Sequence, residues 1–439
     1  MPEHIRIEKS LNLFEKALQL IPGGSQTGSK RPSEFVPGAY PIYVQRGKGC
    51  RVWDIDGNEY IDYVLALGPI TLGYCYPAID EGIKWQLEKG IIFGLLHPLE
   101  VEAAEAITEV VPCAEMVRFF KTGAEAISAA VRVARAFTGR EKVATYGYHG
   151  WHDTWACMSP SPAGDGVPTA FKNYVYSFGY NDFDSSASLK SLLEQHPGEF
   201  ACIVMEATSY WEKPKQGYLR EVKRLSEEHG ALLIFDEIVT GFRLALGGAQ
   251  ELFQITPDLA VIGKGVAAGM PLSAVVGMRR YMERMSDLLI SITHGGEALS
   301  LAASVAAIRE YKGKKVQAHL WEQGRKLMEA MNKIASEAGV PMEWGGYPPI
   351  PMYRFNVGDP GLAEDLMTLW LQENARRGVL YRRGGPAYIC FSHSDEDIER
   401  TISVGEEAMK IIRDALQGGD VRARLEVTGP TEKGTRRFT

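Results

Sequence analysis

The sequence predicts an α/β protein with two domains: a large domain built on a mostly parallel sheet flanked by helices, and a smaller α+β domain. The chain has 439 residues, which is too long for one simple core. Between about 100 and 310, apolar strand-like runs alternate with helical patterns, which is typical of a parallel sheet with helices on both faces. After residue 313 the order changes to a long charged helix followed by short strands and helices.

Residues 1–63 are predicted to form a helix and a hairpin region that pack with the small domain. Leu11, Phe14 and Leu18 fall on one face of an amphipathic helix near the N-terminus. The turn residues 56–58, Asp-Gly-Asn, separate two alternating runs and predict a β-hairpin.

The large domain is expected to span 64–312. Its apolar runs predict strands at 116–120, 142–145, 201–205, 231–235, 259–262 and 273–277. Its helical patterns predict helices at 100–111, 124–137, 217–229 and 298–311.

The small domain is expected to span 313–418. The patterns predict helices at 316–338, 362–376 and 395–415, and strands near 352–356 and 387–391. The tail 419–439 mixes charges with glycine and proline and has no apolar period, so we expect it to be disordered.

The bulk composition indicates a cytoplasmic enzyme. A net charge of −7 argues against nucleic acid or an anionic membrane as a partner. The six cysteines form no Cys-x-x-Cys pair, which favours reduced thiols over disulfides or a zinc site. The N-terminal residues do not form a signal peptide, and no apolar run approaches the length of a membrane span.

A carboxylate and a lysine end two of the predicted strands. Asp236 follows the run 231–235, and Lys264 follows the run 259–262. Ligands of parallel sheets bind beyond the carboxyl ends of the strands. Pyridoxal phosphate (PLP) chemistry needs this combination, because a lysine forms a Schiff base with the cofactor aldehyde and a carboxylate keeps the pyridine nitrogen protonated. The alternative is a strand-end acid and a solvated surface lysine.

A candidate phosphate site follows the predicted strand 116–120. Thr122, Gly123 and Ala124 stand at its turn into the next helix, where backbone amides and the helix N-terminus attract an anion. The alternative is an ordinary strand-to-helix turn with a helix cap. The chain contains neither a P-loop nor a dinucleotide-binding glycine fingerprint.

An aromatic cluster at 146–152 follows another predicted strand and includes Tyr148 and His149. A ring at this position would stack on a cofactor plane, whereas the alternative is a core or interface aromatic. His149 and His152 lack a second pair of ligands, so we expect no metal site.

The ordered set of segments resembles the class III (ω-amino) aminotransferases of fold type I, and among them the glutamate-1-semialdehyde aminomutase branch. The resemblance extends to about residue 415. Lys264 follows Asp236 by 28 residues, as in that family. The segments that carry the resemblance are 52–62, 122–126, 135–140, 148–150, 236–243, 257–258, 263–265 and 269–271.

The resemblance implies pyridoxal 5'-phosphate as the cofactor, with Lys264 and Asp236 as the catalytic residues. It implies that Ile238 and Tyr148 flank the cofactor ring and that Thr293 reaches the phosphate of the other subunit of a homodimer. It implies small-molecule partners, an amine donor and a carbonyl acceptor, and active sites at the subunit interface. The implied cofactor-binding residues are Thr122, Gly123, Ala124, Tyr148, His149, Glu206, Asp236, Ile238, Lys264 and Thr293.

Three departures from the aminomutase concern the substrate. Lys30, with Arg31 next to it, stands where the aminomutase has an arginine, and lysine lacks the bidentate fork of arginine. Leu67 replaces a tryptophan, and His-Gly-Gly-Glu at 294–297 replaces Ser-Gly-Asn-Pro. Lys30, Arg31 and Leu67 are therefore candidate substrate contacts, and the changed segments resemble a branch associated with sugars or other non-amino-acid aldehydes and ketones.

We therefore expect an aminotransferase acting between two molecules, with glutamate-1-semialdehyde 2,1-aminomutase as the alternative. Racemisation or decarboxylation on the same fold is a further possibility. A nicotinamide-dependent oxidoreductase fits the strand–helix alternation but not the missing glycine fingerprint. A catalytically silent homologue disagrees with the retained Asp236 and Lys264.

Overall fold

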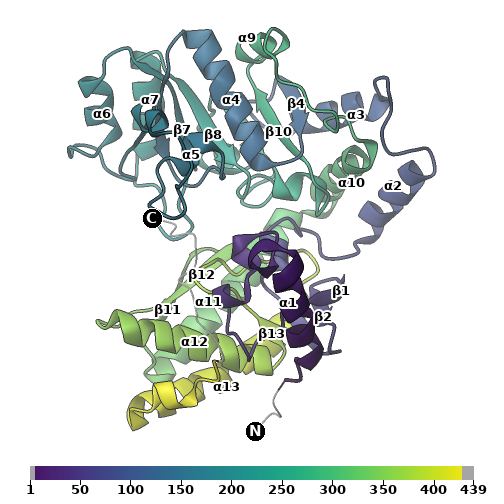
Figure 1. Cartoon of the computed structure of the whole chain (residues 1–439), viewed down its shortest axis with the longest axis vertical. Coiled ribbons are helices and arrows are strands. Elements are labelled where there is room, and N and C mark those ends of the chain that lie inside the picture. Colours follow the sequence, from purple (N-terminus) through teal and green to yellow (C-terminus); the bar gives the residue numbers. More distant parts are fainter. Residues whose placement is uncertain (1–4, 428–439) are drawn as a thin grey trace. The chain divides into compact units, whose positions relative to one another are not determined.

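The computed structural model describes residues 5–427 and divides the chain into two compact units. One unit spans Pro77–Gln317, and the other combines the residues up to Tyr76 with those from Ala318 onward (Figure 1). Each unit is described by itself. Within residues 5–427, no helix has both the length and the apolar character needed to cross a membrane.

The unit Pro77–Gln317 is built on a seven-stranded sheet with the order β4-β10-β9-β8-β7-β5-β6. Only β10 runs antiparallel to its neighbours, so the predicted α/β fold with a mostly parallel sheet is confirmed. The strands are β4 (Met116–Phe120), β5 (Lys142–Tyr146), β6 (Val175–Ser177), β7 (Phe200–Met205), β8 (Leu232–Glu237), β9 (Leu259–Ile262) and β10 (Ser273–Gly277).

Helices cover this sheet because its central strands are buried on both faces. Every residue of β7, β8, β9 and β10 is buried. The helices of this unit are α2 (Pro77–Leu87), α3 (Pro98–Thr108), α4 (Gly123–Thr138), α5 (Asp153–Ala156), α6 (Leu189–Gln195), α7 (Tyr218–Glu228), α8 (Ala249–Phe253), α9 (Arg279–Met282) and α10 (Ala298–Lys314).

Helix α4 shows how the sequence fixes these elements. Thr122 caps its N-terminus in a capping box with Glu125, and Gly139 ends it in a left-handed conformation with φ +68°. Its small apolar face packs across β10, β9, β8 and β7, and α4 lies over the sheet in Figure 1. This close packing of α4 on the sheet makes the helix and the strands beneath it one rigid layer.

The second unit contains a four-stranded sheet with the order β1-β2-β3-β13 and a separate hairpin of β11 and β12. The predicted turn at 56–58 is confirmed, because it joins the antiparallel strands β2 and β3 with Gly57 at φ +100°. The strands are β1 (Val44–Lys48), β2 (Arg51–Asp54), β3 (Glu59–Asp62), β11 (Met342–Tyr347), β12 (Ile350–Phe355) and β13 (Val379–Leu380). The helices are α1 (Glu8–Leu20), α11 (Val316–Ala338), α12 (Pro360–Arg376) and α13 (Asp395–Gly418).

Two expectations for the C-terminal region need correction. The segment 387–391 is not a strand: its amides donate to carbonyls of several separate segments, for example Tyr388 to Tyr63 and Phe391 to Thr71. An apolar run buried in this way shows no period that separates it from a strand. The expected disordered tail begins with a short 3₁₀ helix at Val421–Arg424, and its residues 428–439 lie outside the described part of the chain.

Candidate active site

Five strands of the seven-stranded sheet end in residues that the sequence singled out. Thr122 and Gly123 follow β4, Tyr148 and His149 follow β5, and Glu206 follows β7. Asp236 lies near the end of β8, and Lys264 lies two residues after the end of β9. Because β7, β8 and β9 are parallel neighbours, these side chains reach one edge of the sheet.

Asp236 is held by a buried hydrogen-bond pair with His149. Nδ1 of His149 lies 2.8 Å from Oδ2 of Asp236, and both side chains are almost fully buried. Nε2 of His149 lies 3.1 Å from the carbonyl oxygen of Tyr146, and the amide of Ile238 donates to Oδ1 of Asp236 at 3.1 Å. Each imidazole nitrogen of His149 thus lies within hydrogen-bond distance of an oxygen atom. The pair fixes the orientation of the Asp236 carboxylate.

Glu206 is a second buried carboxylate beside this pair. Tyr210 donates its hydroxyl to Oε1 of Glu206 at 2.7 Å, and the amide of Tyr148 donates to Oε2 at 3.3 Å. Burial raises the pKa of the Glu206 carboxyl, and the charge of Asp236 raises it further, whereas His149 and the two hydrogen bonds lower it. A Cβ on Gly147 would lie 2.6 Å from Oε2, so the chain must turn here without a side chain.

The residues after β4 form a compact strand-to-helix turn. A Cβ on Gly123 would lie 2.4 Å from Cδ1 of Ile238, so the Ile238 side chain fills the space that this glycine leaves. The hydroxyl of Ser273 donates to the carbonyl oxygen of Thr122 at 2.8 Å and ties the turn to β10. Thr122 itself caps α4 by accepting from the amide of Glu125. The amides at the start of α4 thus form a rigid anion-binding geometry.

Lys264 has a strained backbone. Its φ is +41°, in the left-handed region that non-glycine residues rarely adopt, and its side chain belongs to a half-buried residue. Ile238 also packs close to the preceding Gly263, where an added Cβ would lie 3.4 Å from its Cγ2. Strain of this kind occurs at functional sites where the surrounding structure imposes it.

Thr293 lies apart from this group, on the turn ahead of α10. It is exposed and lines a cleft of about 540 Å³ with residues that include Phe93, Leu96, Arg118 and Phe119. Several apolar side chains around this cleft are unusually exposed, above all Leu95 at 87% and Leu96 at 89%. Exposed apolar side chains that gather in this way are common at interaction surfaces.

The candidate substrate residues Lys30, Arg31 and Leu67 belong to the other unit. Lys30 and Arg31 are exposed and lie at a short 3₁₀ helix, Gly28–Lys30. This segment is anchored by Glu34, which is fully buried and accepts from Arg382 at 3.1 Å. The sequence reasoning did not single out this anchor, because a glutamate and an arginine 348 residues apart give no local pattern.

Leu67 lies in a strained turn within the same unit. Leu65, Ala66 and Leu67 have φ values of +43°, +53° and +71°, and Gly68 follows at +105°. Asp62 stabilises the turn by accepting from the amides of Val64 and Leu65 at 2.7 and 3.2 Å. Three successive non-glycine residues in the left-handed region make this a strained turn.

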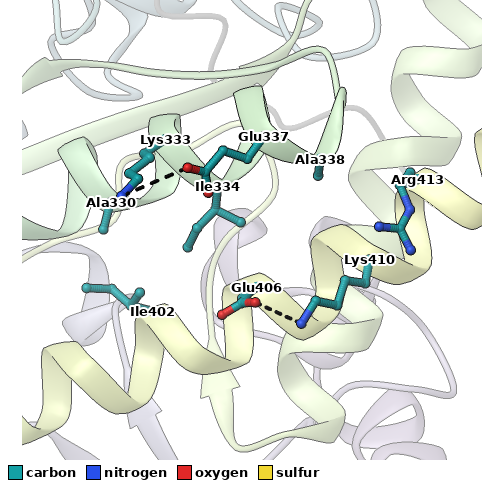
Figure 2. A pocket seen from close by; sticks show the side chains of 9 residues that line it. All are labelled: Ala330, Lys333, Ile334, Glu337, Ala338, Ile402, Glu406, Lys410 and Arg413. Atoms are coloured by element: carbon teal, nitrogen blue, oxygen red, sulfur yellow. Dashed lines mark ion pairs between the residues drawn. The ribbon is translucent and has the colours of Figure 1, made fainter.

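A separate cleft of about 430 Å³ lies between α11 and α13 (Figure 2). Its charged residues are paired along their own helices, Lys333 with Glu337 at 3.9 Å and Lys410 with Glu406 at 2.7 Å. None of the residues predicted from the sequence lines this cleft, and its paired charges give it no evident chemistry.

Comparisons with known proteins fit this geometry. The family model described as Aminotransferase class-III matches residues 36–343, which is more than half of the chain. A 3-aminobutyryl-CoA aminotransferase of Cloacimonas acidaminovorans is 38% identical over 95% of this chain and 100% of its own length. The chain belongs to the class III aminotransferases.

Other class III relatives are similar to this chain over nearly its whole length. A glutamate-1-semialdehyde 2,1-aminomutase of Persephonella marina is 34% identical over 92% of this chain and 99% of its own. A solved transaminase with PLP bound superposes with a TM-score of 0.85 at 27% identity, covering 93% of this chain and 99% of that chain. The chain is therefore a PLP-dependent class III aminotransferase, which confirms the predicted family, enzyme class and cofactor.

The residues present fit PLP. A class III aminotransferase needs an amine, a carboxylate and an anion cradle at one sheet edge, and this sheet edge carries Lys264, buried Asp236 and the Gly123 turn. Gly150, with φ +111°, brings the turn after β5 against the first turn of α4, where a Cβ would lie 2.6 Å from Cβ of Ala124. The sequence analysis included Gly150 in the segment 148–150 that carries the resemblance, but it assigned this glycine no role.

Substitution of Gly123 by alanine is expected to weaken PLP binding. The new methyl group would collide with Ile238, and overpacking of this kind costs about 1–3 kcal/mol. The measurement is a titration of apo-protein with PLP, followed by absorbance. I238A in the G123A background should recover part of the affinity, and G313A, where nothing lies within 4 Å, should bind PLP normally. Equal affinity of G123A and wild type would contradict the cradle.

The raised pKa of Glu206 predicts a pH dependence. A carboxyl whose pKa is higher in the folded than in the unfolded state stabilises the fold below its ordinary pKa, and this stabilisation is lost as pH rises through the raised value. In apo-protein, the free energy of unfolding of E206Q relative to wild type should therefore increase from acid to neutral pH. Denaturant unfolding at several pH values measures it.

A matched control has the opposite sign. The hydrogen bond from Lys142 lowers the pKa of the exposed Glu199, so E199Q should lose stability relative to wild type as pH rises. If the free energy of unfolding of E206Q relative to wild type does not change with pH, the raised pKa of Glu206 is contradicted.

Proposed function

We propose that the chain transfers an amino group between two molecules and that Lys264 and Asp236 carry the chemistry. The observation that carries this proposal is the placement of both residues at the ends of neighbouring parallel strands, with Asp236 oriented by buried His149. PLP, when bound, supplies an aldehyde that takes up the amine and a ring that accepts electrons. The protein supplies the groups that bind, orient and move protons.

Each residue has a proposed part in the reaction. The Lys264 amine would hold PLP covalently and would take a proton from the carbon that bears the substrate amine and return one. The Asp236 carboxylate would hold the pyridine nitrogen of bound PLP and keep its proton there. Amides of Gly123 and Ala124 bind the phosphate, helped by the Thr122 hydroxyl. Ile238 and Tyr148 flank the ring, while Glu206 and His149 fix the polar surroundings.

We propose that the substrate amine lies on the carbon β to an acyl carbonyl, as in a 3-aminoacyl thioester or its free acid. The Cloacimonas relative, a 3-aminobutyryl-CoA aminotransferase that aligns over 95% of this chain, supports this class. The changes at Lys30 and Leu67, which remove the arginine and tryptophan of the aminomutase, point away from a small amino acid with a fixed carboxylate partner.

The test is a substrate panel with the PLP-loaded enzyme. 3-Aminobutyryl-CoA, free 3-aminobutyrate and glutamate-1-semialdehyde are each supplied, with 2-oxoglutarate as acceptor for the first two. The proposal predicts bleaching of the yellow enzyme and glutamate formation with at least one of the two 3-amino compounds. Turnover of glutamate-1-semialdehyde alone would instead establish the aminomutase, which the Persephonella relative favours.

We also propose that two copies form a homodimer whose interface covers the cleft lined by Thr293. Exposed Leu95, Leu96 and Leu289 (85%) support a covering partner of matching apolar character. Light scattering should give twice the chain mass. L96D should shift the protein toward monomer and weaken PLP retention, and a monomeric wild type with full activity would contradict the proposal.

A further inference from the structure

An ion pair joins the residue that follows β4 to the residue that caps α10. Nζ of Lys121 lies 2.9 Å from Oε2 of Glu297, and the two side chains are only 17% and 10% exposed. Lys121 directly precedes Thr122 and Gly123, the turn that forms the proposed phosphate cradle. Glu297 follows Thr293 by four residues and caps α10.

The Glu297 carboxylate has a complete set of donors. It accepts from the amides of Leu299 at 2.7 Å and Ser300 at 3.2 Å, and from the Ser300 hydroxyl at 2.6 Å. Burial raises the pKa of Glu297, but the donors Ser300 and Lys121 outweigh it and lower the pKa overall. The carboxylate therefore stays charged at the N-terminus of α10, where the helix dipole also favours it.

The turn between Thr293 and Glu297 is tightly packed. Amides of Gly295 and Glu297 donate to the carbonyl oxygens of Ile292 and His294. A Cβ on Gly296 would lie 2.8 Å from the Glu100 carboxyl, and one on Gly295 would lie 3.3 Å from the carbonyl oxygen of Phe119 in β4. The turn has little freedom of its own, so the contact that joins it to the end of β4 sets its position.

We propose that the Lys121–Glu297 pair is a positioning link that fixes the Thr293 turn relative to the strand end that carries the phosphate cradle. This inference rests on the proposed function and its proposed homodimer, together with the contact that the resemblance implies between Thr293 and the phosphate of the other subunit. Lys121 and Glu297 do not touch the cofactor: they act through Thr293.

Lys121 is the residue to change, because Glu297 also caps α10 and its loss would disturb the helix. K121M retains the aliphatic stem and removes only the charge. The expected result is PLP affinity about tenfold lower than wild type, within the range measured for interacting residue pairs. K121R should restore the affinity. K312M removes an exposed lysine paired with Glu109 in the same unit and should bind PLP normally.

A double-mutant cycle with T293A tests the route of the effect. If the link acts through Thr293, K121M lowers PLP affinity in the wild type but has no further effect in T293A. E297Q, which retains an acceptor oxygen for the helix cap, should behave like K121M if K121M folds poorly. Circular dichroism and the Tm of the apo-proteins establish folding in each case.

Four outcomes are decisive. Unchanged PLP affinity in folded K121M and E297Q would overturn the link, and additive effects of K121M and T293A would show that Lys121 acts on the cradle alone. Failure of wild type to bind PLP would refute the proposed function, which is a different result. If K121M causes no further loss of PLP affinity in the T293A background, the positioning role is confirmed.

Discussion

Replacement of Lys264 by alanine is expected to abolish aminotransfer and to leave the fold intact. Lys264 follows β9, the parallel neighbour of the strand that carries Asp236, and it is proposed both to attach PLP and to move the substrate proton. Loss of one proton-transfer group reduces rates by up to about 10⁴-fold, and loss of the attachment adds to this. The measurement is glutamate formation with the best substrate of the panel.

The chain offers a matched control for this change. Lys315 is another lysine in the same unit with a left-handed backbone, φ +50°, but it is exposed at the end of α10. K315A should retain full activity, while K264A keeps the wild-type Tm and loses its yellow colour after dialysis. Turnover by K264A near the wild-type rate would refute the assignment.

Replacement of Asp236 by asparagine is expected to lower kcat about 10²–10³-fold, the loss seen when one preorganised electrostatic contact is removed from an active site. Asparagine keeps the shape but not the charge that holds a proton on the pyridine nitrogen. It also leaves His149 without its ionic partner, now 2.8 Å away. We expect faster loss of PLP on dialysis, measured by absorbance.

Asp258 provides the comparison. It is also buried at the sheet, where it accepts from the amide of Leu233 at 2.8 Å and pairs with Lys223 at 3.1 Å, but it lies at the start of β9. D258N should lower the Tm and leave PLP affinity unchanged, whereas D236N should lower PLP affinity and leave the Tm unchanged. A D236N enzyme with normal kcat and PLP retention would contradict the proposed role.

The fold could be predicted from the sequence where the apolar periodicity agrees with the residues that begin and end an element. The strand ending at Phe120 and the helix that follows it were placed correctly, because Thr122 and Gly139 mark the two ends of the helix. The short strands β6 and β13 were missed, since three and two residues carry no period. The segment 387–391 was misassigned because burial by irregular contacts leaves the same apolar signature as a strand.

Only the parts of the site that lie at strand ends, or that the family resemblance implies, could be predicted from the sequence. Asp236 and Lys264 stood out because each ends an apolar run, and the structure brings both to one edge of the sheet. The bond between His149 and Asp236, and the pair of Lys121 with Glu297, join residues 87 and 176 positions apart. Contacts over such separations depend on tertiary packing, which local patterns do not encode.

The most direct test is to trap the bond between the protein and its cofactor. The purified enzyme is loaded with PLP, reduced with borohydride, digested and mapped by mass spectrometry. The account predicts one pyridoxyl-modified peptide, with the added mass on Lys264 and none in K264A. A modification on another lysine, or no modification in an enzyme that still transfers amino groups, would contradict it.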